Sequence, residues 1–420
     1  MSAVCYRKVN YGSVFIIFWG SYMSLAILRL KAQADRRLRS GHLWVYSNEV
    51  DTKLSPLTQF SQGQAVIIES AQGKALGIAL MAPNQLVCAR LYSRDIEHPF
   101  DKSLLVHRLN IAASLRDAIY PSPFYRLVNA EADFLPGIEI DRFGDYFVVQ
   151  LSTQAMEQHK ALLLEAIVQV FKPEAVLWRH DLPNRDWEEL PRYVETAYGE
   201  FPEALMVEEN GLDFVTHALE KKKTSWQFDL QSSRQQLAQW VTDRRVLCLY
   251  ADTGAWPITA AIAGAESVVA LEAGELATDL LLENAEQHQV QEIVQCLQGE
   301  VLEGLQSLKA EEQRFDLVII DPPAFIKRKK DLKTGEAGYR KLYEGTMRLL
   351  NRDGLLLVNS RSPFFNEEQM QAALLASARH LDRNLQVLQV SGASPCYPSH
   401  PAINESRVLK TMVCRVLPTS

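Results

Sequence analysis

Residues 316–325 read DLVIIDPPAF, an apolar run that ends in an acid followed by two prolines. A near-continuous apolar run is typical of a strand that is covered on both faces of a parallel sheet. Proline has a fixed φ and no N–H, so the two prolines end the strand and stiffen the chain behind it. A structural turn alone explains the prolines but not the acid, so we predict a catalytic role for Asp321. The turn is then suited to gripping a planar base through Pro322, Pro323 and Phe325.

The same pattern recurs on both sides of this stretch. Strand-like apolar runs occupy residues 246–251, 267–272, 293–297, 355–359, 385–390 and 408–416. Stretches with helical spacing, such as 275–288 and 367–381, lie between them. This alternation predicts a doubly wound α/β domain over residues 206–420. Ligands of such sheets bind outside the carboxyl ends of the strands, so the residues that follow each strand are the candidate site.

The turn after the first of these strands reads ADTGAWP at 251–257. A glycine there lets the backbone approach a ligand, but the three-glycine dinucleotide fingerprint is absent, which disfavours NAD. Glu272 closes the second strand, where an acid accepts hydrogen bonds from ribose hydroxyls in nucleoside-binding folds. The predicted cofactor-binding residues are therefore Asp252, Thr253, Gly254 and Glu272, with Glu300 after the third strand as a candidate partner of an adenine amino group. An ordinary turn and a surface-exposed Glu300 are the structural alternatives.

The chain has 420 residues, which is too long for a single small fold. Residues 23–100 contain short β-like runs broken by glycines, which predicts a small barrel or sandwich. Residues 101–205 alternate strands with a helix, which predicts a small α+β module. Residues 1–22 include the apolar run VFIIFW, which is too short to span a bilayer, and we interpret them as a non-native extension.

The balance of acidic and basic residues differs between segments of the chain. The formal net charge is −7, so any contact with nucleic acid has to be local. Residues 23–100 are net basic, and their candidate RNA contacts are Arg29, Lys31, Arg36, Arg37, Arg39, His42 and Trp44. A second basic run beside the proline turn predicts phosphate contacts by Lys327, Lys329 and Lys330, with residues 221–223 adding charge. A solvated basic face is the alternative, and the acidic middle module is interpreted as a spacer.

Six cysteines are scattered along the chain without a CxxC pair or a histidine cluster at ligand spacing. This pattern predicts neither a disulfide scaffold nor a metal site, and it fits the reducing cytoplasm. The sequence does not specify the oligomeric state, and a homodimer is compatible with it.

Four motifs, in this order and spacing, resemble one known family. They are GHLWVYS at 41–47, EADFLPGIEIDR at 131–142, DPPAF at 321–325 with Lys327 and Tyr339, and ESRVLK at 405–410. From about Leu25 to Val416 the chain is similar to the RlmI-like S-adenosylmethionine-dependent methyltransferases, which methylate carbon 5 of cytosine in large-subunit ribosomal RNA. The resemblance implies an N-terminal PUA RNA-binding domain, a central α+β module and a class I methyltransferase domain. It also implies S-adenosylmethionine (SAM) as the cofactor and rRNA as the partner.

The chain departs from the family pattern at the cofactor side. Residues 223–225 read KTS where the family usually has Lys-Thr-Gly, and residues 229–234 read DLQSSR. Of the family's polar run this segment keeps Asp229 and Arg234. The resemblance therefore implies Asp229 as a further cofactor-side residue.

A second departure concerns the nucleophile. The family carries a cysteine between two serines, and here Arg361 stands between Ser360 and Ser362. Carbon 5 of cytosine is a poor nucleophile that is activated by adding a thiolate to carbon 6. Three interpretations remain open. Cys396 supplies a displaced thiolate, although a buried inert thiol is its structural alternative; another atom, such as an exocyclic amine, is methylated; or the chain is a lapsed catalyst that binds RNA as a ribosome-assembly factor.

Overall fold

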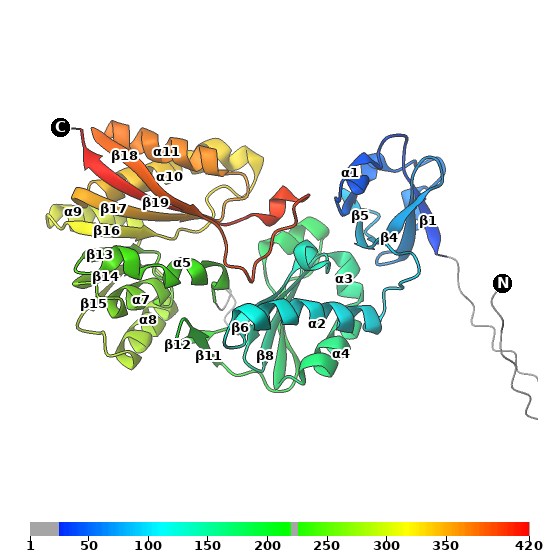
Figure 1. Cartoon of the computed structure of the whole chain (residues 1–420), viewed down its shortest axis with the longest axis horizontal. Coiled ribbons are helices and arrows are strands. Elements are labelled where there is room, and N and C mark those ends of the chain that lie inside the picture. The colour runs from blue at the N-terminus through cyan, green and yellow to red at the C-terminus, as the bar shows by residue number, and fades with distance from the viewer. Residues whose placement is uncertain (1–24, 220–225, 420) are drawn as a thin grey trace, which may run out of the picture.

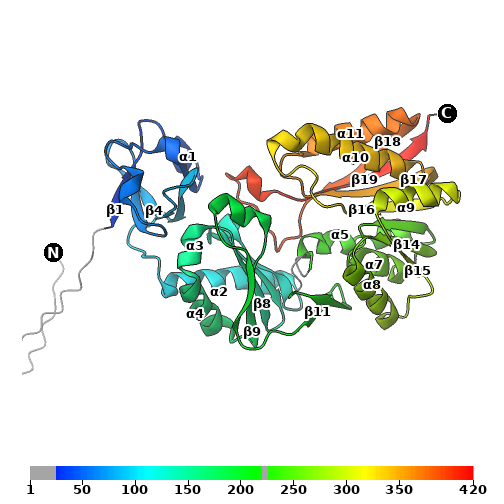
Figure 2. The same cartoon turned by 180° about the vertical axis from the view of Figure 1, so that it is seen from behind.

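The computed structural model describes residues 25–219 and 226–419. The predicted extension over residues 1–22 lies outside the described residues, and so do Lys221, Lys222 and Lys223. Figures 1 and 2 show three lobes in a row, with the N-terminal lobe at one end and the C-terminal lobe at the other. The boundary predicted near residue 100 falls just before the helix Lys102–Ile119, whereas the one predicted near residue 205 falls within the strand Ala204–Glu209.

The N-terminal lobe is built on one five-stranded sheet, as the β-rich pattern of this segment predicts. The strand order is β1-β3-β4-β5-β2, and β1 pairs in parallel with β3 whereas the other pairs are antiparallel. Alternate residues of β3 are buried, because successive side chains of a strand point to opposite faces. The elements are β1 (Ala26–Arg29), α1 (Arg36–Arg39), β2 (Trp44–Tyr46), β3 (Ala65–Glu69), β4 (Ala75–Met81) and β5 (Val87–Ser93).

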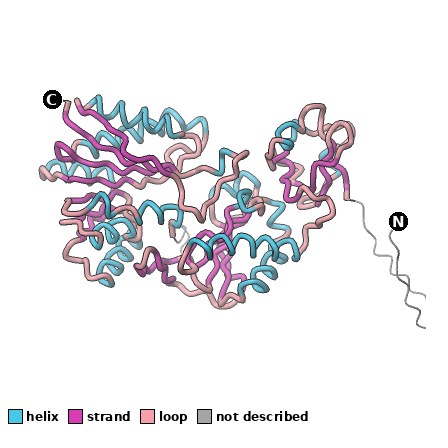
Figure 3. Tube along the Cα trace, in the orientation of Figure 1, coloured by secondary structure: helices cyan, strands magenta, loops and turns pink. Residues whose placement is uncertain are grey.

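The central lobe is an α+β unit with the strand order β10-β9-β8-β7-β6. Its helices pack on the sheet, and the lobe ends in the two-stranded hairpin β11–β12 that leads toward the C-terminal lobe (Figure 3). The elements are α2 (Lys102–Ile119), β6 (Phe124–Asn129), β7 (Ile138–Phe143), β8 (Tyr146–Leu151), α3 (Gln154–Gln158), α4 (Lys160–Phe171), β9 (Ala175–His180), β10 (Tyr193–Tyr198), β11 (Ala204–Glu209) and β12 (Leu212–His217).

The C-terminal lobe is the predicted doubly wound α/β domain, with the strand order β15-β14-β13-β16-β17-β19-β18. Strands β13 to β17 run parallel, but β19 is antiparallel to both of its neighbours, so the sheet is mixed rather than wholly parallel. The elements are α5 (Gln231–Gln235), α6 (Ala238–Val241), β13 (Arg245–Leu249), α7 (Ala255–Ile262), β14 (Ser267–Glu272), α8 (Glu275–Gln287), β15 (Val294–Gln298), α9 (Val301–Ala310), β16 (Phe315–Ile320), α10 (Leu332–Met347), β17 (Leu350–Ser360), α11 (Glu367–His380), β18 (Arg383–Ser391) and β19 (Lys410–Pro418).

The strand order reverses at β13, because β14 lies on one side of it and β16 on the other. The crevice at such a switch point is where open α/β sheets bind ligands. The proline turn after β16 and the turn after β13 both open onto it.

The connection between β18 and β19 ties the three lobes together. Its Cys396 carbonyl accepts a hydrogen bond from the buried guanidinium of Arg116 at 2.9 Å, and its Pro398 carbonyl accepts one from Asn129 at 2.8 Å. Further along, Ile403 is part of the N-terminal hydrophobic core. The central and C-terminal lobes also share one continuous core, in which the Phe143 ring packs 5.2 Å from a ring of the segment before α5. The lobes are therefore fixed against one another around the crevice.

No helix among residues 25–219 and 226–419 is long and apolar enough to cross a membrane.

A buried histidine in the central sheet makes the stability of the fold sensitive to acid. His180 is fully buried, and neither ring nitrogen has a hydrogen-bond partner. Burial lowers its pKa from 6.5 to about 3, and the neighbouring cations Arg185 and Lys160 add to the shift whereas Glu157 opposes it. His180 therefore binds a proton near pH 6.5 in the unfolded chain but only near pH 3 in the folded chain.

We expect the free energy of unfolding to fall as the pH drops from about 6.5 toward about 3, as the linkage relation requires. Urea unfolding at a series of pH values measures this slope. The substitution His180→Phe keeps an aromatic ring between Trp178 and Tyr193 and should flatten the slope. An unchanged slope in this variant would assign the acid sensitivity to other groups.

Candidate functional site

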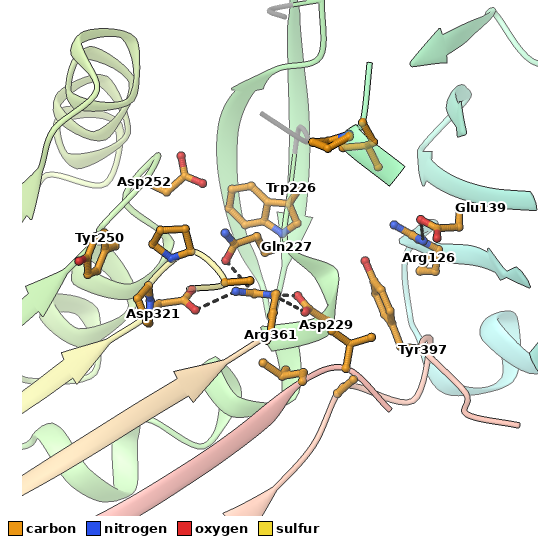
Figure 4. A pocket seen from close by; sticks show the side chains of 18 of the residues that line it. Arg126, Glu139, Trp226, Gln227, Asp229, Tyr250, Asp252, Asp321, Arg361 and Tyr397 are labelled. Atoms are coloured by element: carbon orange, nitrogen blue, oxygen red, sulfur yellow. Dashed lines mark hydrogen bonds and ion pairs between the residues drawn. The ribbon is translucent and has the colours of Figure 1, made fainter. Parts of the chain in front are cut away.

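A cavity of about 990 Å³ opens at the carboxyl ends of β13, β14, β16 and β17, where the C-terminal sheet faces the central lobe. Figure 4 shows its lining side chains converging from both lobes. The lining residues include Arg126, Asn129, Glu139, Asp181, Arg192, Trp226, Gln227, Asp229, Tyr250, Asp252, Glu272, Asp321, Pro322, Pro323, Ala324, Arg361 and Tyr397. Among the described residues there is no cluster of three or more metal-ligating side chains.

One end of the cavity is organised by the carboxylate of Glu272. Its Oε2 accepts a hydrogen bond from the Asp252 amide at 2.9 Å, and its Oε1 accepts one from the Gly274 amide at 2.9 Å. Two non-glycine residues of the turn, Tyr250 and Asp252, have left-handed backbone conformations with φ of +61° and +50°. Such conformations persist where the surrounding structure holds them, and they often mark functional sites. The buried acid thus fixes the turn.

A second buried polar side chain supports this turn from behind. Asn284 of α8 accepts a hydrogen bond from the Val215 amide at 2.7 Å and donates to the Val215 carbonyl at 3.0 Å. It also donates to the Thr253 carbonyl at 3.0 Å. One amide side chain therefore joins β12, α8 and the turn after β13.

The other notable feature is an arginine shared by two buried acids. Arg361 Nη1 donates to Asp321 Oδ1 at 2.8 Å, and its Nε and Nη2 donate to Asp229 at 2.7 and 3.1 Å. Gln227 accepts a further bond from Nη2 at 3.1 Å, and the Trp256 indole donates to Asp321 Oδ2 at 3.4 Å. Figure 4 shows the guanidinium between the two carboxylates.

The pKa values of the two acids are shifted in opposite directions, although Arg361 lowers both. Burial raises the pKa of Asp321 above its ordinary value, although Arg361 opposes this. Burial would also raise the pKa of Asp229, but there the guanidinium prevails and lowers it. Asp229 receives two bonds from Arg361, and the charges of Arg234 and Arg126 lower its pKa further. Asp321 receives one bond from Arg361, and the negative charge of Asp229 adds to the rise of its pKa. Asp321 is thus the more basic of the two carboxylates.

A buried hydroxyl cluster positions the backbone that carries Arg361. The Tyr339 hydroxyl lies 3.1 Å from Ser360 Oγ and 2.8 Å from Ser362 Oγ. Lys410 donates to the Ser362 carbonyl at 2.7 Å. The serines on either side of Arg361 therefore point away from the cavity into the lobe, and the guanidinium points into it.

Most of the residues predicted around the two strand ends lie together. Asp229, Asp252, Glu272, Asp321, Pro322 and Pro323 all line the cavity. Thr253 borders a small cleft beside it, and Gly254, with φ of +97°, caps α7.

Two predicted residues lie elsewhere. Glu300 is exposed and caps α9, and it does not line the cavity. Phe325 packs against Tyr339 with ring centroids 4.7 Å apart and lines a separate cavity of about 450 Å³. Strand β16 ends where expected, but the phenyl ring of Phe325 packs against α10 rather than facing the cavity.

Cys396 is buried in the core that the central and C-terminal lobes share, and it does not line the cavity. Its Sγ lies 3.8 Å from the Phe228 carbonyl oxygen, and its amide donates to the Tyr120 hydroxyl at 3.1 Å. Burial raises the pKa of this thiol to about 11. A buried thiol of high pKa is chemically inert, so this placement argues against Cys396 as a nucleophile.

The basic residues expected to contact RNA divide into two sets. In the N-terminal lobe, Arg29, Arg37 and Arg39 form ion pairs with Glu69, Glu49 and Asp35, and Lys31 donates to a backbone carbonyl. Arg36 is exposed and has no side-chain partner among the described residues. Lys327, Lys329 and Lys330 are exposed as well, and no described residue pairs with them.

The aromatic pair expected to stack on RNA has a structural contact instead. The Trp44 indole donates to Glu131 of the central lobe at 2.8 Å, and the His42 ring packs edge-on against Trp44 at 5.6 Å. Both side chains are only partly exposed. The free RNA-facing stacking surface expected from the sequence is thus partly used to join two lobes.

The central lobe is not the spacer that its acidic composition suggests. It supplies Arg126, Asn129, Glu139, Asp181 and Arg192 to the cavity wall. The sequence feature that could have revealed this contribution is the motif at 131–142, because its Glu139 lines the cavity.

Comparison with known proteins agrees with this architecture. Residues 28–94 match the PUA-like domain family, and residues 228–381 match a family described as conserved hypothetical protein 95. The ribosomal RNA large subunit methyltransferase I of Aliivibrio fischeri strain MJ11 is 31% identical over 400 residues, which cover 94% of this chain and 100% of the relative. The Vibrio cholerae strain O395 protein of the same name is 30% identical over 402 residues, with the same coverage.

Two solved structures show the same fold over nearly the whole chain. A candidate methyltransferase in complex with SAH superposes with a TM-score of 0.80 at 19% identity, covering 93% of this chain and 100% of that chain. A candidate SAM-dependent methyltransferase from Streptococcus mutans gives 0.79 at 18% identity, with the same coverage.

We expect Asn284→Ala to lower the free energy of unfolding by about 3 kcal/mol, because it leaves backbone groups of Val215 and Thr253 buried without partners. Urea unfolding measures the loss. The matched control is Gln287→Ala on the same helix, since its side chain makes a single exposed hydrogen bond to the Asp213 carbonyl. Equal effects of the two substitutions would contradict the role given to Asn284.

Proposed function

Because the chain belongs to the ribosomal RNA large subunit methyltransferase I family, we propose that it is a SAM-dependent methyltransferase acting on large-subunit rRNA. The carrying observation is that Glu272 and Asp321 line one cavity from strand ends on either side of β13. A cofactor and a base held at these two positions would share one cavity. The proposed location is the cytoplasm, where rRNA is assembled into ribosomes.

The residues at the Glu272 end suit the nucleoside part of SAM. The Glu272 carboxylate lies at the carboxyl end of β14 and lines the cavity, and ribose hydroxyls are donors that carboxylate oxygens accept. Asp252 and Thr253 present polar groups from the fixed turn beside it, and Asp229 approaches from the segment before α5. Bound SAM would supply a methyl group on a positively charged sulfur, which the surplus of carboxylates in the cavity favours.

Asp321 is suited to hold the base and to take its proton. Arg361 and Trp256 fix its carboxylate, and its remaining lone pairs can accept an amino N–H of a base. In methyl transfer, the electron pair of the attacking atom forms the new bond to the methyl carbon, and the electrons of the broken bond stay on sulfur. The attacking atom then loses a proton. The raised pKa of Asp321 makes it a suitable acceptor for that proton.

The methylated atom depends on how the base is activated. Cytosine carbon 5 is the target that the family resemblance implies, and its usual route needs a thiolate. The free cysteines of the described residues, Cys88, Cys248, Cys296, Cys396 and Cys414, do not line the cavity. We infer that Arg361 occupies the position of the family cysteine. An exocyclic amine has a lone pair on its nitrogen and needs no thiolate for activation. It is therefore the second possible target of methylation in this cavity.

The proposed RNA surface combines the exposed basic groups on two lobes. The exposed Lys327, Lys329 and Lys330 follow the proline turn at the cavity, and the N-terminal lobe adds Arg36 at a distance. Such cations contact phosphates without reading sequence. The lobe that carries the PUA-like match would then dock a structured part of the RNA while the target base enters the cavity.

We expect Glu272→Ala to weaken SAM binding about tenfold or more, because it removes charged hydrogen bonds to the ligand and to the turn. Isothermal titration calorimetry on the full chain measures the dissociation constants. The variant Glu272→Gln retains an acceptor and should lose less. Wild-type affinity in Glu272→Ala would remove this carboxylate from the cofactor site.

Mass mapping of rRNA is expected to reveal one methyl group that is absent from a strain lacking the gene. A plasmid carrying the wild-type chain should restore it, and one carrying Asp321→Ala should not, because the base would lose its acceptor. The same spectra identify the methylated atom. Complete methylation in the deletion strain would contradict the proposed enzyme.

The arginine between the two acids favours one alternative function, a ribosome-assembly factor that binds RNA without catalysis. The substitution Arg361→Cys tests it by placing a thiol between the two serines. If Arg361 serves an active enzyme, transfer of labelled methyl groups to rRNA should fall, because Asp321 loses its cation. If the chain is instead a lapsed enzyme, the wild-type protein should transfer no methyl groups to rRNA, and the Arg361→Cys variant should gain this activity.

A further inference from the structure

We propose that the end of the cavity formed by the central lobe is a subsite for the nucleotide next to the methylated one, and that it selects a base with an amino group. This inference rests on the proposed function, since it assumes that RNA enters the cavity. The subsite consists of Asn129, Glu139 and Tyr397, supported by Arg126.

The subsite is separated from the position where methyl transfer would occur. Asp321, Arg361 and Asp229 are connected by hydrogen bonds across the cavity. Beyond Asp229 lie Tyr397 and then Glu139, and Figure 4 shows these side chains in this sequence. A base held by Asp321 therefore leaves the central-lobe end for a second nucleotide of the same strand.

Two side chains of the subsite offer hydrogen-bond acceptors. Oε2 of Glu139 accepts a hydrogen bond from Arg126 Nη1 at 2.7 Å, whereas Oε1 of Glu139 has no hydrogen-bond partner among the described residues. Asn129 donates its amide nitrogen to the Pro398 carbonyl at 2.8 Å. That bond fixes the amide and leaves its oxygen as the remaining acceptor. A base that fits here has to present donors.

An aromatic ring provides the stacking surface. The guanidinium carbon of Arg126 lies 4.7 Å from the centroid of the Tyr397 ring. Arg126 itself is immobilised by two bonds to Asp141, at 2.6 and 3.1 Å. A ring held in this way is a rigid platform, and aromatic platforms of this kind stack unpaired bases in RNA-binding proteins.

The charge of this end disfavours a phosphate. Arg126 lies between the carboxylates of Glu139 and Asp141, and Asp229 of the other lobe lies close enough for the Arg126 charge to lower its pKa. The two other charged groups of the wall are already paired, Asp181 with Arg179 and Arg192 with Asp186. The surplus is negative, so an amino group of cytosine, adenine or guanine is attracted. Uracil has no amino group, and its carbonyl oxygens would be repelled by the acceptor oxygens of Glu139 and Asn129.

Fluorescein-labelled RNA pentamers test this selection. Each has a central cytidine, and either neighbour is varied among the four bases. Fluorescence anisotropy with the full chain and saturating SAH gives the dissociation constants. We expect pentamers with an amino-bearing base at the neighbour that occupies the subsite to bind about fivefold or more tightly than the uridine pentamer, within the range of a specific base contact.

The substitution Glu139→Gln should reduce this preference to less than about twofold, because an amide offers a donor as well as an acceptor. Asp141 still holds Arg126 in this variant. The matched control is Glu165→Gln on the exposed face of α4, which should keep the wild-type preference. Asn129→Ala provides an independent second variant with the same expected loss.

A preference that survives Glu139→Gln and Asn129→Ala would overturn the subsite, and so would equal binding of all wild-type pentamers or binding of none. Failure of the proposed function has a different signature. It would appear as absent SAH binding in a calorimetric titration of the same sample, or as no missing methyl group in the rRNA map.

Discussion

One guanidinium fixes three segments that are distant in sequence. Arg361 follows β17, Asp229 precedes α5 and Asp321 follows β16, and four of the hydrogen bonds at this junction come from the single arginine. Breaking a buried ion pair by removing one partner typically costs about 3–5 kcal/mol, because a charge is left uncompensated. The same arginine lowers the pKa of both acids against the effect of their burial. Shape and chemistry of the site are therefore coupled through this side chain.

The sequence predicted the parts of the site that depend on local pattern. An apolar strand that ends in an acid and two prolines has few structural alternatives, so Asp321 and its turn were found at the end of β16. Glu272 was found for the same reason, since a strand register fixes which residue is last. The N-terminal sheet and the α/β lobe also followed from periodicity. The reversed direction of β19 did not, because the apolar pattern of a strand is the same in either direction.

Residues whose role depends on tertiary contacts were harder to predict. Phe325 and Glu300 follow the right strands, yet one side chain packs under α10 and the other faces solvent. Trp44 looked like a stacking surface, but its partner Glu131 lies in another lobe and no local pattern reveals it. The contribution of the central lobe was missed for a similar reason. Its net acidity described the whole segment, whereas the cavity is lined by a few residues from the ends of its strands.

The distribution of charge explains how an acidic chain can act on RNA. Carboxylates outnumber cations in the cavity lining, whereas Lys327, Lys329 and Lys330 are exposed behind the proline turn. Phosphates are repelled by the first environment and attracted by the second, and the amino groups of bases have the opposite preference. On the proposed function, these charges would orient an approaching nucleotide with its backbone outside the cavity and its base inside. Since exposed charges are screened by salt far more than buried ones, raising the ionic strength weakens docking of the backbone more than recognition of the base.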